Sequence, residues 1–225
     1  TAQGMDAAIV MHLAIGTSLA TIALTSLASI RAHHRRGAVV WPWVMRLLPG
    51  IVLGALGGAW LADQLHTGVL KRFFGVFELL VAVQLLFVSR YQAHFVMPGR
   101  VGMGVAGAVI GAVSALIGIG GGTLTVPFLM WCRAAAIQAV ATAAACGFPI
   151  AVAGALGFVA TGWREPGLPP LASGYLYWPA WAGIVLASTS AAGFGAWLAH
   201  RLPAQQLRRL FALLLAALGL NMLLA

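Results

Sequence analysis

Long apolar runs, separated by short connectors that carry most of the polar residues, dominate the sequence. Most of these runs reach the roughly 18–20 residues that an α-helix needs to cross the hydrocarbon core of a bilayer. The pattern therefore predicts an all-α fold, a polytopic transmembrane helix bundle with the lipid bilayer as its solvent. The predicted apolar segments comprise residues 5–30, 44–61, 73–88, 101–131, 134–161, 176–199 and 207–224.

The composition agrees with a membrane protein. Hydrophobic residues make up 61% of the chain and charged residues 8%, whereas charged residues are about a quarter of an ordinary soluble domain. The formal net charge of +9 comes from short basic clusters between the apolar runs. Such clusters are typical of the cytoplasmic loops of membrane proteins, and they argue against nucleic-acid binding. Cys132 and Cys146 lie in apolar sequence and are interpreted as core residues rather than as a disulfide.

The two halves of the chain resemble each other. Residues 58–62 and 195–199 both read GAWLA, at an offset of 137, and residues 14–17 match residues 139–142 at an offset of 125. Self-similarity of this kind indicates an internal repeat. The predicted domains are two transmembrane repeats, residues 1–92 and 98–225.

The repeat also predicts a further segment at the N-terminus. The offset of 137 pairs Trp41-Pro42 with Trp178-Pro179, but nothing in the first repeat corresponds to residues 101–125. We therefore expect the first repeat to begin with about 25–30 more residues, including a first copy of the glycine motif described below.

The distribution of Lys and Arg favours a hairpin in segment 101–131. If every segment crossed the membrane once, the connectors on the two sides would carry 7 and 6 basic residues. If segment 101–131 returns to the side from which it entered, the counts become 10 and 3, and the positive-inside rule prefers this arrangement. The hairpin also inverts the second repeat relative to the first, as in many secondary transporters. The sequence therefore predicts an inverted internal repeat with glycine-broken hairpin helices.

A glycine motif, IGIGGGTLTVP at residues 117–127, lies in the middle of this hairpin. Three consecutive glycines each carry a helix penalty of about 1 kcal/mol relative to Ala, so the backbone should unwind there. The helix that restarts after them would point free N–H groups and a positive dipole end into a cavity. Thr123 and Thr125 add hydroxyl donors, and such a site favours a small anion. The alternative is close packing of helices at small residues.

Hydroxyl side chains in the first segment are further candidates for the site. Thr17 and Thr21 are four residues apart and share one helix face, with Ser18 beside them. Their repeat counterparts are Thr142 and Cys146. Hydroxyls in helices also bond the carbonyl one turn earlier, which is the structural alternative. The predicted substrate-binding residues are Gly118, Gly120, Gly121, Gly122, Thr123, Thr125, Thr17, Ser18, Thr21, Thr142 and Cys146.

Glu78 is the only acidic residue well inside a predicted segment. A carboxylate within a membrane is a functional candidate, and Glu78 could carry a coupling proton. The alternatives are an ion pair with Lys71 or a position nearer the membrane surface. We find no metal-ligand spacing, no Ser-His-Asp set and no nucleotide-binding motif. The sequence therefore predicts a protein that is not an enzyme and needs no metal or cofactor.

The glycine motif, followed by residues 139–142, resembles the TauE/SafE sulfite exporter family, and residues 14–20 match the other copy of the family's repeat. The resemblance covers essentially the whole chain. It implies a multi-pass permease of the bacterial cytoplasmic (inner) membrane for small, mostly sulfur-containing anions such as sulfite or an organosulfonate.

Together these observations predict a secondary transporter that exports a small sulfur-containing anion. The anion would bind at mid-membrane to helix N-termini at the glycine breaks and to Thr and Ser hydroxyls. The expected partners are this small anionic substrate and the lipid bilayer, and a homo-oligomer is left open. The alternatives are an anion channel or a membrane-embedded accessory or assembly subunit without transport activity.

Overall fold

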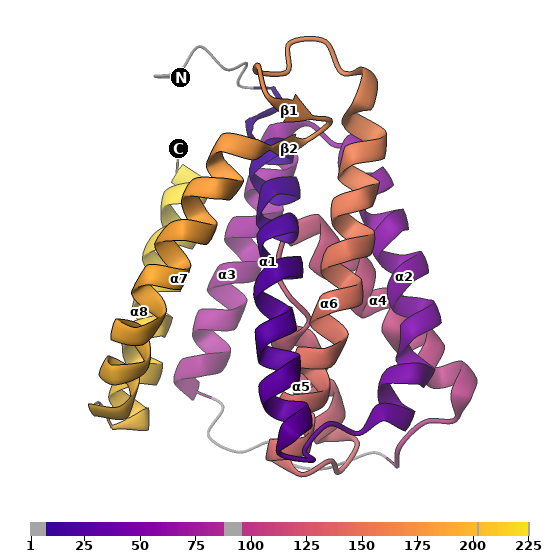
Figure 1. Ribbon diagram of the computed structural model, residues 1–225, viewed down its shortest axis with the longest axis vertical. Helices are drawn as coiled ribbons and strands as arrows, with labels where there is room; N and C mark the ends of the chain where they lie inside the picture. The colour runs from indigo at the N-terminus through magenta and orange to yellow at the C-terminus, as the bar shows by residue number, and fades with distance from the viewer. Residues whose placement is uncertain (1–7, 88–95, 202, 225) are drawn as a thin grey trace. The chain divides into compact units, whose positions relative to one another are not determined.

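The computed structural model describes residues 8–87, 96–201 and 203–224, and most of them are helical (Figure 1). The all-α class is therefore confirmed. The described helices are α1 (Val10–Arg35), α2 (Trp41–Asp63), α3 (Thr67–Phe87), α4 (Arg100–Ile117), α5 (Gly122–Trp131), α6 (Ala136–Thr161), α7 (Trp178–Arg201) and α8 (Ala204–Leu224).

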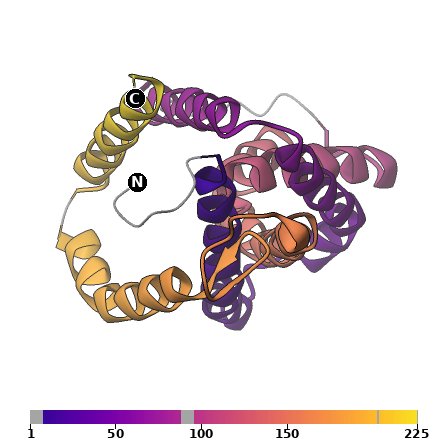
Figure 2. The same ribbon diagram turned by 90° about the horizontal axis from the view of Figure 1, so that it is seen from above.

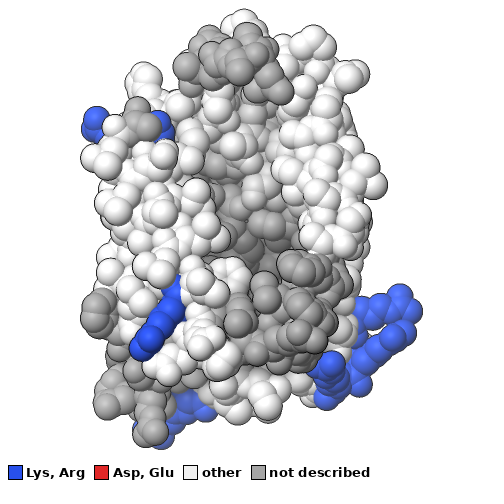
Figure 3. Space-filling model, turned by 90° about the vertical axis from the view of Figure 1, so that its left-hand side faces the viewer, with Lys and Arg blue, Asp and Glu red and all other residues white. Residues whose placement is uncertain are grey.

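Four of these elements are long and apolar enough to cross a membrane. They are α1, α2, α4 and the stretch Ala136–Arg164, which joins α6 to a short 3-10 helix, η1 (Gly162–Arg164). Helix α5 (Gly122–Trp131) and the part Arg209–Leu224 of α8 are also apolar but shorter. Most of the described surface on the face in Figure 3 is uncharged, with a few blue Lys and Arg groups and no red Asp or Glu groups.

The observed helices differ from the predicted segments mainly at their ends. Helix α1 continues to Arg35, beyond the predicted end at residue 30, because nothing breaks the helix before Gly37, which has φ +64°. Its predicted beginning at residue 5 lies outside the described residues. Helix α2 begins at Trp41, earlier than predicted, because Pro42 is accommodated in the first turn.

The helices fall into two compact units. Of the described residues, the first unit comprises 8–67 and 96–181, and the second comprises 68–87, 182–201 and 203–224. The first therefore contains α1, α2, α4, α5, α6 and the start of α7, and the second contains α3, the rest of α7 and α8.

Helix lengths agree with the predicted repeat. Helices α1 and α6 each have 26 residues, and α3 and α8 each have 21. The boundary expected at residue 92 lies outside the described residues, and both the two-repeat division and its inverted orientation stay predictions.

The first unit is built on a close parallel pair, α2 and α4. Built Cβ atoms at Gly50 and Gly54 overlap backbone atoms of Gly104 and Ala108, respectively. Contacts that advance together along both helices show that the helices run in the same direction. Small residues at every fourth position let the two backbones touch, as in other membrane helix pairs.

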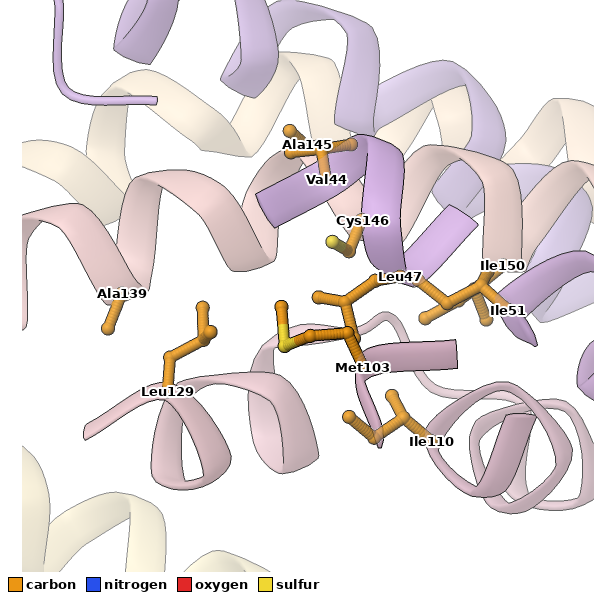
Figure 4. Packing of buried hydrophobic residues seen from close by; sticks show 10 residues of the cluster. All are labelled: Val44, Leu47, Ile51, Met103, Ile110, Leu129, Ala139, Ala145, Cys146 and Ile150. Atoms are coloured by element: carbon orange, nitrogen blue, oxygen red, sulfur yellow. The ribbon is translucent and has the colours of Figure 1, made fainter. Parts of the chain in front are cut away.

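Helices α5 and α6 complete the core of this unit (Figure 4). Leu129 of α5 and Cys146 and Ile150 of α6 meet residues of α2 and α4, and all three are completely buried. The core cluster comprises Val44, Leu47, Ile51, Met103, Ile110, Leu129, Ala139, Ala145, Cys146 and Ile150.

Helices α1 and α6 pack side by side beneath a short β-hairpin (Figures 1 and 2). The hairpin joins β1 (Ala172–Ser173) and β2 (Leu176–Tyr177) as antiparallel strands. Its close fit requires glycines beneath it: a Cβ atom at Gly162 would lie 2.6 Å from the Tyr175 nitrogen. The sequence patterns did not predict this hairpin.

In the second unit, α3 and α8 cross at a pair of glycines. A Cβ atom at Gly75 would lie 2.9 Å from the Gly219 carbonyl oxygen, and one at Gly219 would lie 2.8 Å from the Gly75 carbonyl oxygen. The two helices therefore approach each other through their backbones.

Candidate functional site

Helix α4 stops at the glycine motif. Gly118 takes up the left-handed conformation (φ 74°, ψ 29°), which only glycine adopts without strain. The N–H of Ile119 donates to the Ser114 carbonyl (3.1 Å) and the N–H of Gly118 donates to the Ala115 carbonyl (3.3 Å). This bond pattern is a Schellman motif, the usual end of a helix at glycine.

Helix α5 begins after a short non-helical link, and its N-terminus is open. No side chain caps α5. Gly122, its first residue, is exposed, and a Cβ atom there would meet nothing within 4 Å. The N–H groups of a first helical turn have no partner within the helix. The start of α5 therefore offers backbone donors, with the positive end of a helix dipole behind them.

The glycines before α5 fit between α1 and α6. A Cβ atom at Gly121 would lie 2.9 Å from Ile150 Cδ1 and 3.2 Å from the Gly147 nitrogen, both on α6. A Cβ atom at Gly120 would lie 3.4 Å from Ile22 Cγ2 on α1. Of the glycines predicted to bind the substrate, Gly121 therefore packs against a neighbouring helix, whereas Gly122 faces open space.

Ser18 ties the interruption to α1. Its hydroxyl donates to the Gly118 carbonyl oxygen at 2.8 Å. The structure thus brings Ser18 and the glycine motif together, while the predicted role of Ser18 in substrate binding stays a prediction. The residue acts on the backbone of the interruption and fixes its position relative to α1.

Thr17 and Thr142 have a reciprocal role that the sequence did not predict. The Tyr177 N–H donates to Thr17 Oγ1, and the Val40 N–H donates to Thr142 Oγ1, both at 3.1 Å. Tyr177 and Val40 directly precede the two helices that begin with Trp-Pro, α7 and α2. Each threonine therefore anchors the start of a helix in the other predicted repeat. This reciprocity agrees with the predicted repeat.

The remaining hydroxyls divide into bonded and unbonded groups. Thr21 donates to the Thr17 carbonyl of its own helix (2.9 Å), which is the structural alternative for such residues. Thr125, one turn into α5, is completely buried, and its Oγ1 has no hydrogen-bond partner among the described residues. Thr123 is half-buried. Cys146 lies fully buried in the core cluster, where it packs against apolar side chains.

Glu78 belongs to α3 in the second unit. Its side chain is 8% exposed, and within the described ranges its Oε2 has no hydrogen-bond partner. A Cβ atom at Gly219 of α8 would lie 3.3 Å from Glu78 Cβ, so the carboxylate sits beside the glycine crossing. Proton coupling by Glu78 stays a prediction.

The hairpin adds a polar cluster that sequence reasoning missed. The buried Tyr175 donates its hydroxyl to Asp63 Oδ1 (3.1 Å), and its ring centre lies 4.9 Å from that of His12. His12 Nε2 in turn lies 2.9 Å from the Ala62 carbonyl oxygen, to which it donates. Burial, followed by the negative charge of Asp63, raises the pKa of Tyr175. Strands of two residues have no detectable periodicity. The only sequence signal was the rise of the repeat offset from 125 to 137, which gives the second repeat 12 extra residues between positions 142 and 178.

The family model described as Sulfite exporter TauE/SafE matches residues 4–222. The chain belongs to the TauE/SafE family. Members of this family are membrane transporters and not enzymes, so this protein is a membrane transporter.

Individual relatives carry the same general description. A probable membrane transporter protein of Haemophilus influenzae is 32% identical over 217 residues, covering 96% of this chain and 82% of the relative. One of Xylella fastidiosa is 29% identical, covering 93% of this chain and 78% of the relative. The probable membrane transporter protein YunE of Bacillus subtilis is 28% identical, covering 53% of this chain and 50% of the relative. No solved structure matches the chain.

Proposed function

We propose that this TauE/SafE protein is a multi-pass secondary transporter of the bacterial inner membrane that exports a small sulfur-containing oxyanion, such as sulfite or an organosulfonate. The observation that carries the proposal is the uncapped N-terminus of α5, which opens beside Gly122 into unoccupied space. The family description supplies the sulfur chemistry.

The start of α5 suits an anion for electrostatic reasons. The aligned peptide dipoles of a helix place about half a positive charge at its N-terminus, next to N–H groups that have no partner in the helix. Oxyanions are the ligands that such termini bind in other proteins. The buried, unpartnered hydroxyl of Thr125 is available as a further donor one turn later.

The site should bind an anion only weakly, because no Lys or Arg occurs between Ile117 and Pro127 to offer a full positive charge. A transported ion must bind well enough to enter and weakly enough to leave. Binding by backbone dipoles and hydroxyls alone meets that requirement. Thr17 and Thr142 contribute by fixing the starts of α7 and α2, and Ser18 by holding the Gly118 carbonyl.

The test is anion flux in proteoliposomes that contain the full chain, with sulfite, an organosulfonate, sulfate and chloride compared. We expect saturable flux of a sulfur oxyanion. Gly122→Leu fills the open space beside the α5 N-terminus, and flux should fall about tenfold or more, the effect of losing roughly 1.4 kcal/mol of interaction. Gly57→Leu is the matched control, because Gly57 of α2 also faces open space and lies outside the glycine motif.

Each outcome is informative. Undiminished flux through Gly122→Leu would refute the site while leaving the transporter intact. Flux without saturation would indicate a channel. If correctly folded protein moves none of the four anions, the accessory-subunit alternative takes the place of the proposal.

A further inference from the structure

A pocket of about 490 Å³ lies in the first unit where α2 and α4 begin. Two arginines, Arg46 of α2 and Arg100 of α4, contribute its charged groups. The other lining residues are Pro42, Met45, Pro49 and Gly104. This pocket is separate from the glycine interruption, which lies at the opposite end of α4.

The register of the helix pair explains why the two arginines meet. Gly50 faces Gly104 and Gly54 faces Ala108 across the parallel α2–α4 contact. The same offset of 54 residues joins Arg46 to Arg100, one helical turn before the first of these contacts. Because the backbones touch along this register, the two guanidinium groups are placed on adjacent helices at the same level.

In the described part of the first unit, no acidic residue lies near enough to neutralise the positive charge of the pocket. In the described part of that unit, the acidic residues are Asp63 and Glu165. Asp63 ends α2, 17 residues after Arg46, which corresponds to about 25 Å along the helix. Glu165 follows α6 at the same distant end, since the hairpin behind it bonds Asp63 through Tyr175.

The backbone adds to this charge. Neither α2 nor α4 has a side-chain cap at its N-terminus. Because α2 and α4 run parallel, both direct the positive ends of their dipoles toward the same end of the unit. An anionic group of the size of a phosphate would meet two arginines and two helix starts there.

An apolar stripe leads away from the pocket. Val101, Val105 and Val109 follow one another at four-residue spacing on α4 and are 82%, 61% and 59% exposed. Met45, which lines the pocket, is 62% exposed. In a membrane protein this stripe faces acyl chains. A phospholipid would thus bind through its phosphate, at the arginines, and through its acyl chains, at the valine stripe. Free phosphate would use the arginines alone.

The end of the unit that holds the pocket is also its basic end. Arg31, Arg35 and Arg36 precede α2, and Arg133 lies between α5 and α6. The positive-inside rule assigns such an end to the cytoplasmic face, whose leaflet supplies anionic lipids.

We propose that the pocket between the N-terminal ends of α2 and α4 binds the phosphate headgroup of an anionic phospholipid, with Arg46 and Arg100 on the phosphate and the valine stripe against the acyl chains. The ligand is a lipid of the surrounding bilayer and not the transported anion. The inference does not depend on which substrate the protein carries.

The experiment uses the full chain in detergent and measures by native mass spectrometry how much phosphatidylglycerol is retained against phosphatidylcholine. The test variant is Arg46→Gln with Arg100→Gln. The control is Arg35→Gln with Arg36→Gln, which removes the same charge from the same end but from outside the pocket. All four arginines are exposed, so both variants should fold like the wild type.

We expect phosphatidylglycerol affinity to fall about 10- to 30-fold in the pocket variant and less than about twofold in the control. Millimolar inorganic phosphate should leave lipid retention unchanged. Equal losses in the two variants would overturn the proposal in favour of general attraction to an anionic surface. Displacement of the lipid by inorganic phosphate would overturn it in favour of a free-anion pocket.

Discussion

Glycine has two opposite uses in two regions of the first unit. In the α2–α4 contact, Gly50, Gly54 and Gly111 leave the helices intact and let their backbones touch. In the interruption between α4 and α5, Gly118 and its neighbours end one helix and precede the next. The same residue type therefore stabilises a helix pair in one place and breaks a helix in the other.

Spacing explains the difference. Glycines four residues apart fall on one helix face, where the loss of helix propensity is offset by close contact with the partner backbone. Consecutive glycines occupy all faces of a helix, and contact on one face cannot offset a penalty of about 1 kcal/mol at each. The first region is held by contacts between backbones, and the second by hydrogen bonds and a left-handed turn.

The largest effect is expected from Gly54→Ala. The new methyl group would overlap the Ala108 backbone of α4, which cannot move aside as a flexible side chain could. We expect the free energy of unfolding to fall by about 3 kcal/mol or more. Gly57→Ala, three residues away and facing open space, should gain up to about 1 kcal/mol. Denaturant titration of both variants measures the difference, and equal stabilities would show that α2 and α4 do not touch at Gly54.

Gly118→Ala should have an intermediate effect. An alanine in the left-handed conformation costs about 1–2 kcal/mol, and its Cβ atom would lie 3.1 Å from Ile15 Cα on α1. Gly37→Ala carries the same backbone strain at φ +64° but meets nothing within 4 Å. The excess destabilisation of Gly118→Ala over Gly37→Ala, from thermal unfolding, measures how closely the turn packs against α1. An excess of zero would contradict that packing.

The smallest effect is expected from Ser18→Ala. The change removes the donor to the Gly118 carbonyl, and we expect a loss of about 1 kcal/mol. Amide hydrogen exchange at residues 118–122 should accelerate about fivefold, since 1 kcal/mol corresponds to that factor. Thr25→Ala is the control, because the Thr25 hydroxyl bonds only carbonyls of its own helix. Faster exchange in both variants would show that Ser18 has no special hold on the interruption.

The sequence could predict the helices and the place of the interruption because both follow from local preferences. Helix α6 ends at Thr161, where the apolar run ends, and α4 ends where glycines make helix continuation unfavourable. The all-α class needs only the lengths of the apolar runs. None of these conclusions requires knowledge of which helix is a neighbour of which.

The contacts of the site could not be predicted, since they depend on neighbours that are distant in the sequence. By sequence, Gly121 and Gly122 are equivalent, but Gly121 packs against α6 and Gly122 does not. The sequence analysis predicted that Thr17 and Thr142 bind the substrate, and that role stays a prediction. Their hydrogen-bond partners, Tyr177 and Val40, lie 160 and 102 residues away, and no local pattern identifies such partners.

The reciprocal threonine bonds delay completion of the fold while the chain is being synthesised. A chain grows by about 5–20 residues per second, so Val40 waits about 5–20 s after its synthesis for Thr142, which is 102 residues later. Thr17 waits about 8–32 s for Tyr177, which is 160 residues later. During that time the first half is in the membrane with both anchors unmade. Neither half can reach its final fold before the insertion machinery has delivered the other, and a stalled ribosome would leave a bundle whose helix starts are not yet fixed.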